Sequence, residues 1–327
     1  MGSREDLLRI LEDNRGGFVS GADLARELGV SGTAVWKAIR KLKSEGYLIE
    51  AVTNKGYRLA SESDVLSLDA VRKYLDMDEL VIDVFHSTDS TNNVCRDKAS
   101  SGQSDGYIAI AANQTKGRGR RGRSFYSPDN TGLYLSMLLR PAGYTAEQAM
   151  RFTTMAAAAV CEAIETVSGK EAGIKWVNDV FMDGRKVCGI LTEASFDLES
   201  STLDYAIVGI GINVFTPEGG FPEEIRDIAG AIFSEDERAE ASIPDIRSRL
   251  AAEVIRHFMK YYRQAAGYMG EYRKRCIVIG RNVNVIMPGA DPRPALALDI
   301  DDECGLIVRY EDGSEATLRS GEISIRM

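Results

Sequence analysis

The stretch "SGADLARELGVSGTAVWKAIRKLKSEG", residues 20–46, decides the fold of the N-terminal part of the chain. Ser20 and Ser31 each stand where a serine can cap the first turn of a helix, and Gly29 between them can end the first helix. The second helix has an inner face of apolar residues at helical spacing, namely Val35, Ile39 and Leu42. Two short helices joined by a turn around a glycine predict a helix-turn-helix.

The segments on either side of this motif complete a winged helix. Upstream, apolar residues recur at helical spacing: Leu7, Ile10 and Leu11. Downstream, "YLIEAVTNKGYRL" (47–59) has two strand-like runs around the turn Asn54-Lys55-Gly56, which predicts a β-hairpin. A helix-turn-helix followed by a hairpin is a winged helix, and we assign residues 1–65 to this DNA-binding domain.

The charge of this domain favours nucleic acid as its partner. Residues 31–60 carry six Lys or Arg against two Glu, a net charge of +4 in a chain whose net charge is −9. A local reversal of sign suits contact with phosphates. We expect the helix-turn-helix Gly21–Arg40 to bind DNA, notably through Thr33, Trp36, Lys37 and Arg40. The alternatives are that the module binds protein instead, and that Trp36, unusual on such a face, packs inward.

The composition of the whole chain limits its class. It has 327 residues, enough for two or three domains, and is 44% hydrophobic and 27% charged, as in ordinary globular proteins. Its five cysteines form no C-x-x-C pair, which favours reduced thiols over a disulfide framework or a zinc site. The charged start "MGSREDLLRI" is unlike a signal peptide, and no apolar run is long enough for a membrane span. We therefore expect a cytoplasmic protein.

The rest of the chain divides into a central part, residues 66–272, and a tail, residues 273–327. A polar linker, "ASESDVLS", leads into the central part, where strands such as "GYIAIAANQ" and "LYLSMLLRP" mix with a long buried helix, "QAMRFTTMAAAAVCEAIETV". The strand in "VIDVFHSTDSTNN" should end in a polar loop, Asp183-Gly184 should form a hairpin turn, and "YAIVGIGINV" should be a strand broken by its glycines. The tail has short strands around turns at Pro288-Gly289 and Asp312-Gly313, which predicts a small β-barrel.

The stretch "GRGRRGRSF", residues 117–125, spells the G-x-G-x-x-G of a dinucleotide loop. A dinucleotide fold needs a helix directly after the glycines, and "SFYSPDNTG" with its proline is not one. Arginine–glycine repeats also bind single-stranded nucleic acid, but one short run in a folded domain is weak support for that. The pattern favours a mobile loop that closes over a small anion, since guanidinium groups bind carboxylate and phosphate in bidentate fashion.

Six motifs of the central part occur in a familiar order: "DSTNN", "GRGRRGR", "LYLSMLLRP", "KWVNDV", "GRKVCGILTE" and "VGIGINV". Together they resemble the biotin–protein ligase family. With the winged helix in front, the chain resembles the bifunctional BirA type of that family, which is ligase and biotin-operon repressor in one. The resemblance implies an α+β multidomain fold: a winged helix-turn-helix, a mixed-sheet α/β ligase domain of the biotin/lipoate ligase type, and an SH3-like C-terminal β-barrel.

The resemblance also implies a reaction and partners. Biotin and ATP, with Mg²⁺, would give biotinyl-5′-AMP, and biotin would then pass to a lysine of the biotin carboxyl carrier protein of acetyl-CoA carboxylase or a related enzyme. Biotinyl-5′-AMP would promote a homodimer that binds the operator DNA of biotin genes, with no membrane involved. The main alternative is a ligase whose winged helix no longer represses transcription. A ligand sensor without catalysis and a lipoate ligase fit the motifs less well.

Finally, the resemblance implies roles for residues. Lys186, Arg118 and Arg120 would be catalytic. The residues expected to bind biotin are Ser90, Thr91, Asn92, Gln114, Arg118, Gly119, Arg120, Lys186 and Gly189. The residues expected to bind ATP or the adenylate are Arg121, Phe125, Lys175, Asn178 and Asn213, with Asp179 as a ligand of Mg²⁺. Two positions depart from the family pattern: Val177 replaces a proline, and Phe125 replaces a tryptophan expected to stack on adenine.

Overall fold

The computed structural model describes residues 4–61, 63–197, 202–240, 244–264, 267–287, 291–319 and 322–325. By its internal contacts the chain divides into two compact units. The N-terminal unit comprises residues 1–66 and 239–248, and the main unit comprises residues 67–238 and 249–327. The main unit thus holds both the central part and the tail of the sequence.

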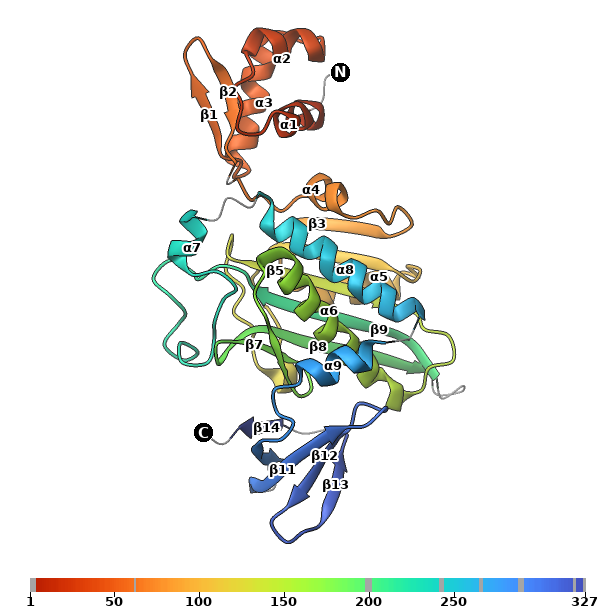
Figure 1. Ribbon diagram of the computed structural model, residues 1–327. Helices are drawn as coiled ribbons and strands as arrows, with labels where there is room; N and C mark the ends of the chain where they lie inside the picture. The colour runs from red at the N-terminus through yellow and green to blue at the C-terminus, as the bar shows by residue number, and fades with distance from the viewer. Residues whose placement is uncertain are drawn as a thin grey trace. The chain divides into compact units, whose positions relative to one another are not determined.

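The N-terminal unit has the elements of a winged helix (Figure 1). These are α1 (Arg4–Asp13), α2 (Gly21–Leu28), α3 (Gly32–Ser44), β1 (Ile49–Val52) and β2 (Gly56–Leu59). The side chains of Ser20 and Ser31 accept hydrogen bonds from backbone N–H groups in the first turns of α2 and α3, so both expected caps are present. Gly29 ends α2 in the left-handed conformation, with φ of 64°. The apolar faces of the three helices and the hairpin share one buried core.

The expected polar linker is anchored rather than free. Arg15 donates a hydrogen bond of 2.8 Å to the carbonyl of Ser63, whose side chain is buried. Arg15 also pairs at 2.6 Å with the buried carboxylate of Asp245. The buried Arg247 donates to Asp64 at 2.7 Å. These two arginines bind the polar groups of the segment, which explains why residues 239–248 belong to the N-terminal unit.

The main unit is built on a seven-stranded sheet of order β3-β4-β5-β9-β8-β7-β6. Its β3–β4 pair is parallel and its other neighbouring pairs are antiparallel, so the sheet is mixed, as expected. The strands are β3 (Val81–Thr88), β4 (Tyr107–Gln114), β5 (Gly132–Leu139), β6 (Gly173–Lys175), β7 (Asp179–Met182), β8 (Arg185–Asp197) and β9 (Thr202–Asn213).

Helix α6 (Met150–Ser168) is the long buried helix that the sequence predicts. It packs on β8 and β9, and Figure 1 draws it in front of them. The remaining helices are α4 (Leu68–Tyr74), α5 (Thr91–Ser100), α7 (Glu235–Glu240), α8 (Ile246–Gln264) and α9 (Tyr268–Arg275), with short 3-10 turns η1 (Arg120–Gly122) and η2 (Ala146–Ala149). None of the helices in the described part of the chain is both long and apolar enough to span a bilayer.

Two local expectations for the central part are wrong. The polar loop expected after β3 is short, because α5 begins at Thr91 with Ser90 at its N-cap position. Strand β9 is continuous through Gly209 and Gly211. These glycines are needed for space and not for a break, since a Cβ at Gly209 would lie 2.0 Å from Oδ1 of Asn92.

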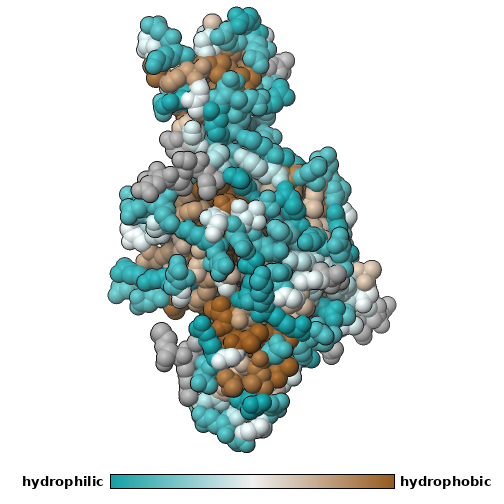
Figure 2. Space-filling model, viewed as in Figure 1, coloured by the Kyte–Doolittle hydropathy of each residue, from teal (hydrophilic) through white to brown (hydrophobic). Residues whose placement is uncertain are grey.

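The tail forms a five-stranded antiparallel sheet of order β13-β12-β11-β10-β14. Its strands are β10 (Asn282–Ile286), β11 (Arg293–Ile300), β12 (Leu306–Tyr310), β13 (Glu315–Leu318) and β14 (Glu322–Ile325). Gly313 has a φ of 83°, as the expected turn requires, whereas the expected turn at Pro288-Gly289 lies outside the described residues. Figure 2 shows apolar side chains gathered over the region where Figure 1 draws α9 and these strands.

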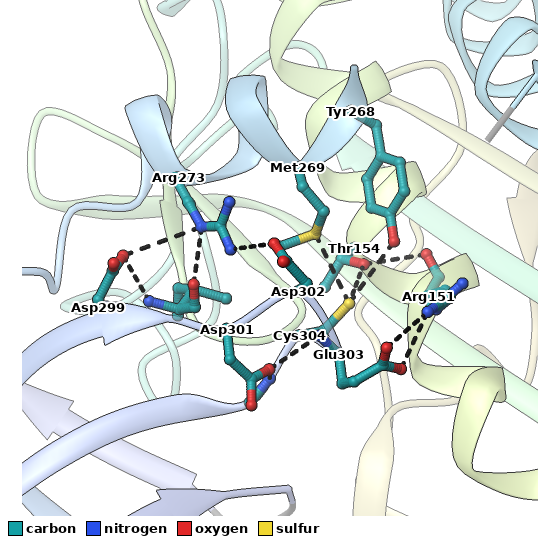
Figure 3. Close-up of polar contacts among 12 residues, drawn as sticks. Arg151, Thr154, Tyr268, Met269, Arg273, Asp299, Asp301, Asp302, Glu303 and Cys304 are labelled. Carbon is teal, nitrogen blue, oxygen red and sulfur yellow. Dashed lines mark hydrogen bonds and ion pairs between the residues drawn. The ribbon is translucent and has the colours of Figure 1, made fainter. Parts of the chain in front are cut away.

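The turn between β11 and β12 holds this sheet against the helices of the main unit (Figure 3). Glu303 pairs with Arg151 of α6 at 2.9 Å, and Asp302 pairs with Arg273 of α9 at 2.7 Å. Between them the buried side chain of Cys304 points into the space between α6 and α9. The C-terminal sheet is therefore packed as part of the main unit.

Candidate active site

One cavity of the main unit collects the residues that the sequence assigns to biotin. It lies where β3 and β4 end, and it is closed on other sides by the arginine loop, β8 and β9. All nine residues expected to bind biotin line this first cavity, from Ser90 and Gln114 to Lys186 and Gly189. They come from segments that are up to about a hundred residues apart in the chain, so the fold brings them together.

Hydroxyl and amide groups form one corner of the first cavity. The backbone N–H of Thr91 donates to Oε1 of Gln114 at 2.9 Å. The buried hydroxyl of Ser136 lies 2.7 Å from Oγ1 of Thr91 and donates to Oδ1 of Asn92 at 2.6 Å. This network fixes the orientation of the side chains, so the corner is prepared to exchange hydrogen bonds with a neutral polar ligand.

The start of α5 is held by a carboxylate next to this corner. Asp89 accepts a 2.6 Å hydrogen bond from the backbone N–H of Ser90 and a 2.7 Å bond from the side chain of Asn93. The Asn93 amide is the main cause that lowers the pKa of Asp89. A carboxylate at the N-terminal end of a helix also stabilises it electrostatically. Asp89 thereby positions the turn that carries Thr91 and Asn92.

The arginine loop folds into a tight turn. The N–H of Gly119 donates to the carbonyl of Arg123 at 2.7 Å, and the N–H of Phe125 donates to the carbonyl of Gly117 at 3.0 Å. A Cβ atom at Gly117 would lie 2.4 Å from the carbonyl oxygen of Phe125, which is too close for any side chain. The three-residue turn η1 stands where a dinucleotide fold would begin a long helix. The glycines thus serve the turn, and the dinucleotide interpretation is excluded.

Side chains of the loop and of β8 pair with groups on neighbouring segments. Arg120 donates to Oδ1 of Asn178 at 2.7 Å. Lys186 pairs with Asp179 at 2.6 Å, and their side chains are 27% and 23% exposed. Arg118 pairs with Glu193, and its Nη2 atom lies 3.0 Å from Oε1 of that residue. Each of the three cations expected to act on the ligand is therefore held at the cavity by a partner.

A second cavity of about 180 Å³ adjoins the first. Arg120, Phe125, Asn178 and Lys186 line both cavities. The second cavity is also lined by Arg123, Lys175, Asp179 and, from the C-terminal sheet, Ile323. The described lining residues of the two cavities thus include five Lys or Arg side chains against one carboxylate, which favours an anionic ligand.

The fit of the second cavity to a metal ion is limited. Within the described ranges no group of three or more His, Cys, Asp and Glu side chains is placed to hold a metal ion. Mg²⁺ commonly takes one or two carboxylates and completes its shell with water and substrate phosphates. Asp179 fits that mode as a single carboxylate, provided that phosphates supply further oxygens.

Small residues and one aromatic ring shape the floor of the first cavity. The ring of Phe125 lies over Gly189 and Gly211, and a Cβ at Gly211 would lie 2.5 Å from it. The neighbouring Cys188 is fully buried, and burial raises the pKa of its thiol well above the usual value. The glycines therefore let the ring of Phe125 lie close to the backbone of β8 and β9. The thiol of Cys188 beside them stays protonated.

One expected residue lies apart from these cavities, another lines a neighbouring cavity, and two functional residues were missed. Asn213 donates to the carbonyl of Gly230 at 2.9 Å, and neither described cavity lining includes it. Arg121 lines a further cavity beside α6, which shares Arg120, Asn178, Ile190 and Leu191 with the first cavity. Ser136 and Glu193 were missed by sequence reasoning. Strand periodicity was the available signal for Glu193, because it lies on the same face of β8 as Gly189.

Comparisons with known proteins identify the family. Residues 84–213 match the biotin/lipoate A/B protein ligase family model, residues 3–58 match an HTH domain, and residues 278–326 match the biotin protein ligase C-terminal domain. The chain is 33% identical to the bifunctional ligase/repressor BirA of Bacillus spizizenii over 95% of both chains. The chain belongs to the bifunctional ligase/repressor family. It is also 30% identical to BirA of Escherichia coli K12, over 95% of this chain and 94% of that one.

A solved structure of the ligase family supports the same assignment. The biotin protein ligase of Aquifex aeolicus, in complex with biotin and ATP, is 27% identical. It superposes with a TM-score of 0.60 and covers 75% of this chain and 98% of its own. The family assignment and the α+β fold with winged helix, mixed sheet and C-terminal β-domain therefore agree with the expectation from the sequence.

The winged helix of this ligase/repressor presents the expected face. Thr33, Trp36, Lys37 and Arg40 are all exposed on α3. Trp36 is 47% exposed, so the alternative of inward packing is wrong. The guanidinium carbon of Arg40 lies 4.8 Å from the centre of the Trp36 ring. This arrangement leaves a cationic and aromatic surface on the second helix of the motif, where such proteins contact DNA.

Proposed function

We propose that the protein activates biotin with ATP to form biotinyl-5′-AMP and transfers biotin to a lysine of a biotin carboxyl carrier protein. The observation that carries this proposal is the convergence of Arg118, Arg120 and Lys186 on a cavity that ends in a hydroxyl and amide corner. The corner suits the neutral ureido ring of biotin, and the cations suit its carboxylate and the phosphates.

In the first step a carboxylate oxygen of biotin attacks the α-phosphorus of ATP, and the bond to pyrophosphate breaks. Both reactants are anions, so their repulsion must be offset before they meet. Lys186 and the loop arginines supply that positive charge at fixed positions, which is a large source of rate acceleration. Lys175, Phe125 and Asn178 hold the adenylate in the second cavity, and Asp179 would hold the Mg²⁺ that accompanies the phosphates.

In the second step the ε-amine of the carrier lysine attacks the acyl carbon of biotinyl-5′-AMP. The acyl–phosphate bond breaks, AMP leaves, and the amine loses a proton as the amide forms. The arginine loop protects the mixed anhydride from water until the carrier arrives. The acceptor is the carrier domain of a biotin-dependent enzyme such as acetyl-CoA carboxylase.

This activity is tested by incubating purified protein with biotin, MgATP and an isolated carrier domain. We expect biotin-dependent release of pyrophosphate and a gain in carrier mass equal to one biotinyl group. Release of pyrophosphate with lipoate in place of biotin, and none with biotin, would contradict the proposed substrate.

We further propose that biotinyl-5′-AMP converts the protein into a dimer that represses biotin genes. A single winged helix makes few phosphate contacts, and two copies on a palindromic operator multiply them. A surface that supports pairing is the edge of β8: strand β7 pairs with β8 only over Arg185–Gly189, and the described residues 191–197 pair with β9 alone. Unpaired strand edges readily pair with another chain. The carrier domain would compete for this face.

Two measurements test the regulatory role. Sedimentation velocity should show a larger species with biotinyl-5′-AMP than without it. DNA from upstream of biotin genes should shift only when biotin and ATP are both present. Equal sedimentation in the two states, at concentrations that shift DNA, would contradict ligand-driven dimerisation. A protein with ligase activity that shifts no such DNA would be a ligase that no longer represses.

A further inference from the structure

We infer that Glu193 is a positioning residue that ties the arginine loop to the biotin corner of the site; this inference rests on the proposed function. Glu193 lies on β8, four residues after Gly189, and its side chain is 23% exposed. The role follows from the set of groups that meet at its carboxylate.

Both oxygens of Glu193 face the guanidinium of Arg118. Oε1 of Glu193 lies 3.0 Å from Nη2 of Arg118, and Oε2 lies 3.2 Å from Nη1. This two-point contact fixes the plane of the guanidinium as well as its position. Because Arg118 is part of the tight turn of the arginine loop, Glu193 holds one side of that loop to the sheet.

The same carboxylate also binds α5. Oε2 accepts a 2.8 Å hydrogen bond from Nδ2 of Asn92 and another of 2.8 Å from Nη2 of Arg96. The other side of the Asn92 amide accepts from Ser136 at 2.6 Å. The amide of Asn92 is therefore fixed at both ends, with its nitrogen toward Glu193 and its oxygen toward Ser136.

One carboxylate thus joins three segments that line the first cavity: α5, the arginine loop and β8. It accepts from two arginines, so the cluster keeps a positive excess toward the ligand. An anion that enters the cavity meets Arg118 already oriented, and the neutral part of the ligand meets Asn92 already oriented. Glu193 does not line either cavity in the described structure, so its effect on the ligand is exerted through these two side chains.

The test uses Glu193→Gln, which keeps the shape of the side chain, and Glu193→Ala. We expect KM for biotin to rise on the order of ten-fold, which corresponds to about 1.4 kcal/mol. The hydrogen bonds to the Glu193 carboxylate are charge-assisted, and partial exposure weakens each of them. KM for ATP should change little, because the second cavity keeps its contacts. Glu315→Gln is the matched control, since Glu315 accepts from Arg309 at 2.8 Å on the C-terminal sheet, outside both cavities.

A second readout does not depend on activity. Trypsin cleaves after arginine, and the arginine loop contains four such cleavage sites, at Arg118, Arg120, Arg121 and Arg123. We expect both Glu193 variants to be cut in the loop several-fold faster than the wild type or the control, at an unchanged thermal midpoint. Wild-type cleavage together with an unchanged KM in the folded Gln variant would overturn the inference. If the wild type forms no biotinyl-5′-AMP, the proposed function fails, and the cleavage rates still decide whether Glu193 holds the loop.

Discussion

Replacement of Lys186 by alanine is the most direct test of the chemistry assigned to the cavity. Lys186 stands at the border of the two cavities, where the carboxylate of biotin and the α-phosphate of ATP would meet. Loss of one preorganised group that stabilises developing negative charge costs on the order of 10²–10³ in rate, or about 3–4 kcal/mol in the barrier. We therefore expect Lys186→Ala to slow biotin-dependent pyrophosphate release by that factor.

The same substitution should leave the fold intact. The ion pair of Lys186 with Asp179 is partly exposed, and such pairs contribute about 0–1 kcal/mol to stability. Asp179 also keeps its 2.9 Å hydrogen bond from the side chain of Asn178. A loss of about 1 kcal/mol is small beside a typical unfolding free energy of about 5–15 kcal/mol. The thermal midpoint should fall by a few degrees at most.

The assay is pyrophosphate release in single-turnover and steady-state form, with the thermal midpoint measured on the same preparations. Lys170→Ala is a matched control, because Lys170 pairs with Glu237 at 2.6 Å, has similar exposure and lines neither cavity. Lys170→Ala should keep the wild-type rate. Near-normal pyrophosphate release by folded Lys186→Ala protein would refute the role assigned to Lys186.

Three further outcomes are expected. Arg118→Ala should release biotinyl-5′-AMP before transfer, because the loop loses its contact with Glu193; an unchanged ratio of free adenylate to labelled carrier would make Arg118 a bystander. Deletion of residues 1–65 should remove DNA binding and leave ligation measurable. It should also lower the thermal midpoint, because Asp245 loses its partner Arg15 and Arg247 loses its partner Asp64. Retained operator binding would refute the assignment of the winged helix. All five cysteines are buried, and burial raises the pKa of Cys95 to about 12 and that of Cys276 to about 11. At pH 8 Ellman's reagent should therefore label the native protein slowly, and it should label all five thiols after unfolding. Fast labelling of the native protein would show that the thiols are accessible.

The sequence predicts those parts of the molecule that depend on local patterns. The caps at Ser20 and Ser31, the left-handed Gly29 and the buried helix α6 follow from short-range rules and are present. The start of α5 at Thr91 was missed, because "STNN" reads equally well as a loop and as a capped first turn. The continuity of β9 was missed because a glycine in a strand usually marks a bend, and here the neighbouring side chains of other segments require it.

Contacts between residues that are distant in the sequence could not be predicted from local sequence patterns. Glu193 is the last residue of the motif "GRKVCGILTE", and strand periodicity places it on the face of Gly189, yet no local pattern reveals that Arg118 and Asn92 will meet it. The anchoring of the linker has the same cause, since Asp64 and Arg247 are 183 residues apart. Composition identifies a polar segment, but only the fold decides whether its polar groups face water or a buried arginine.

The segment around Val177 shows how distant contacts can hold a segment that has no local restraint. The resemblance to the ligase family implies a proline at this position, which would fix φ of the segment that leads to Asn178 and Asp179. In this chain two hydrogen bonds to other parts of the main unit hold the segment. The hydroxyl of Tyr272, buried in α9, donates to the carbonyl of Val177 at 3.2 Å, and the indole of the buried Trp176 donates to the carbonyl of Cys304 at 3.0 Å. The same turn of the C-terminal sheet is fixed by its ion pairs to α6 and α9. The C-terminal sheet and α9 thus give the segment two buried anchors, and the loss of the proline does not leave Asn178 and Asp179 without support.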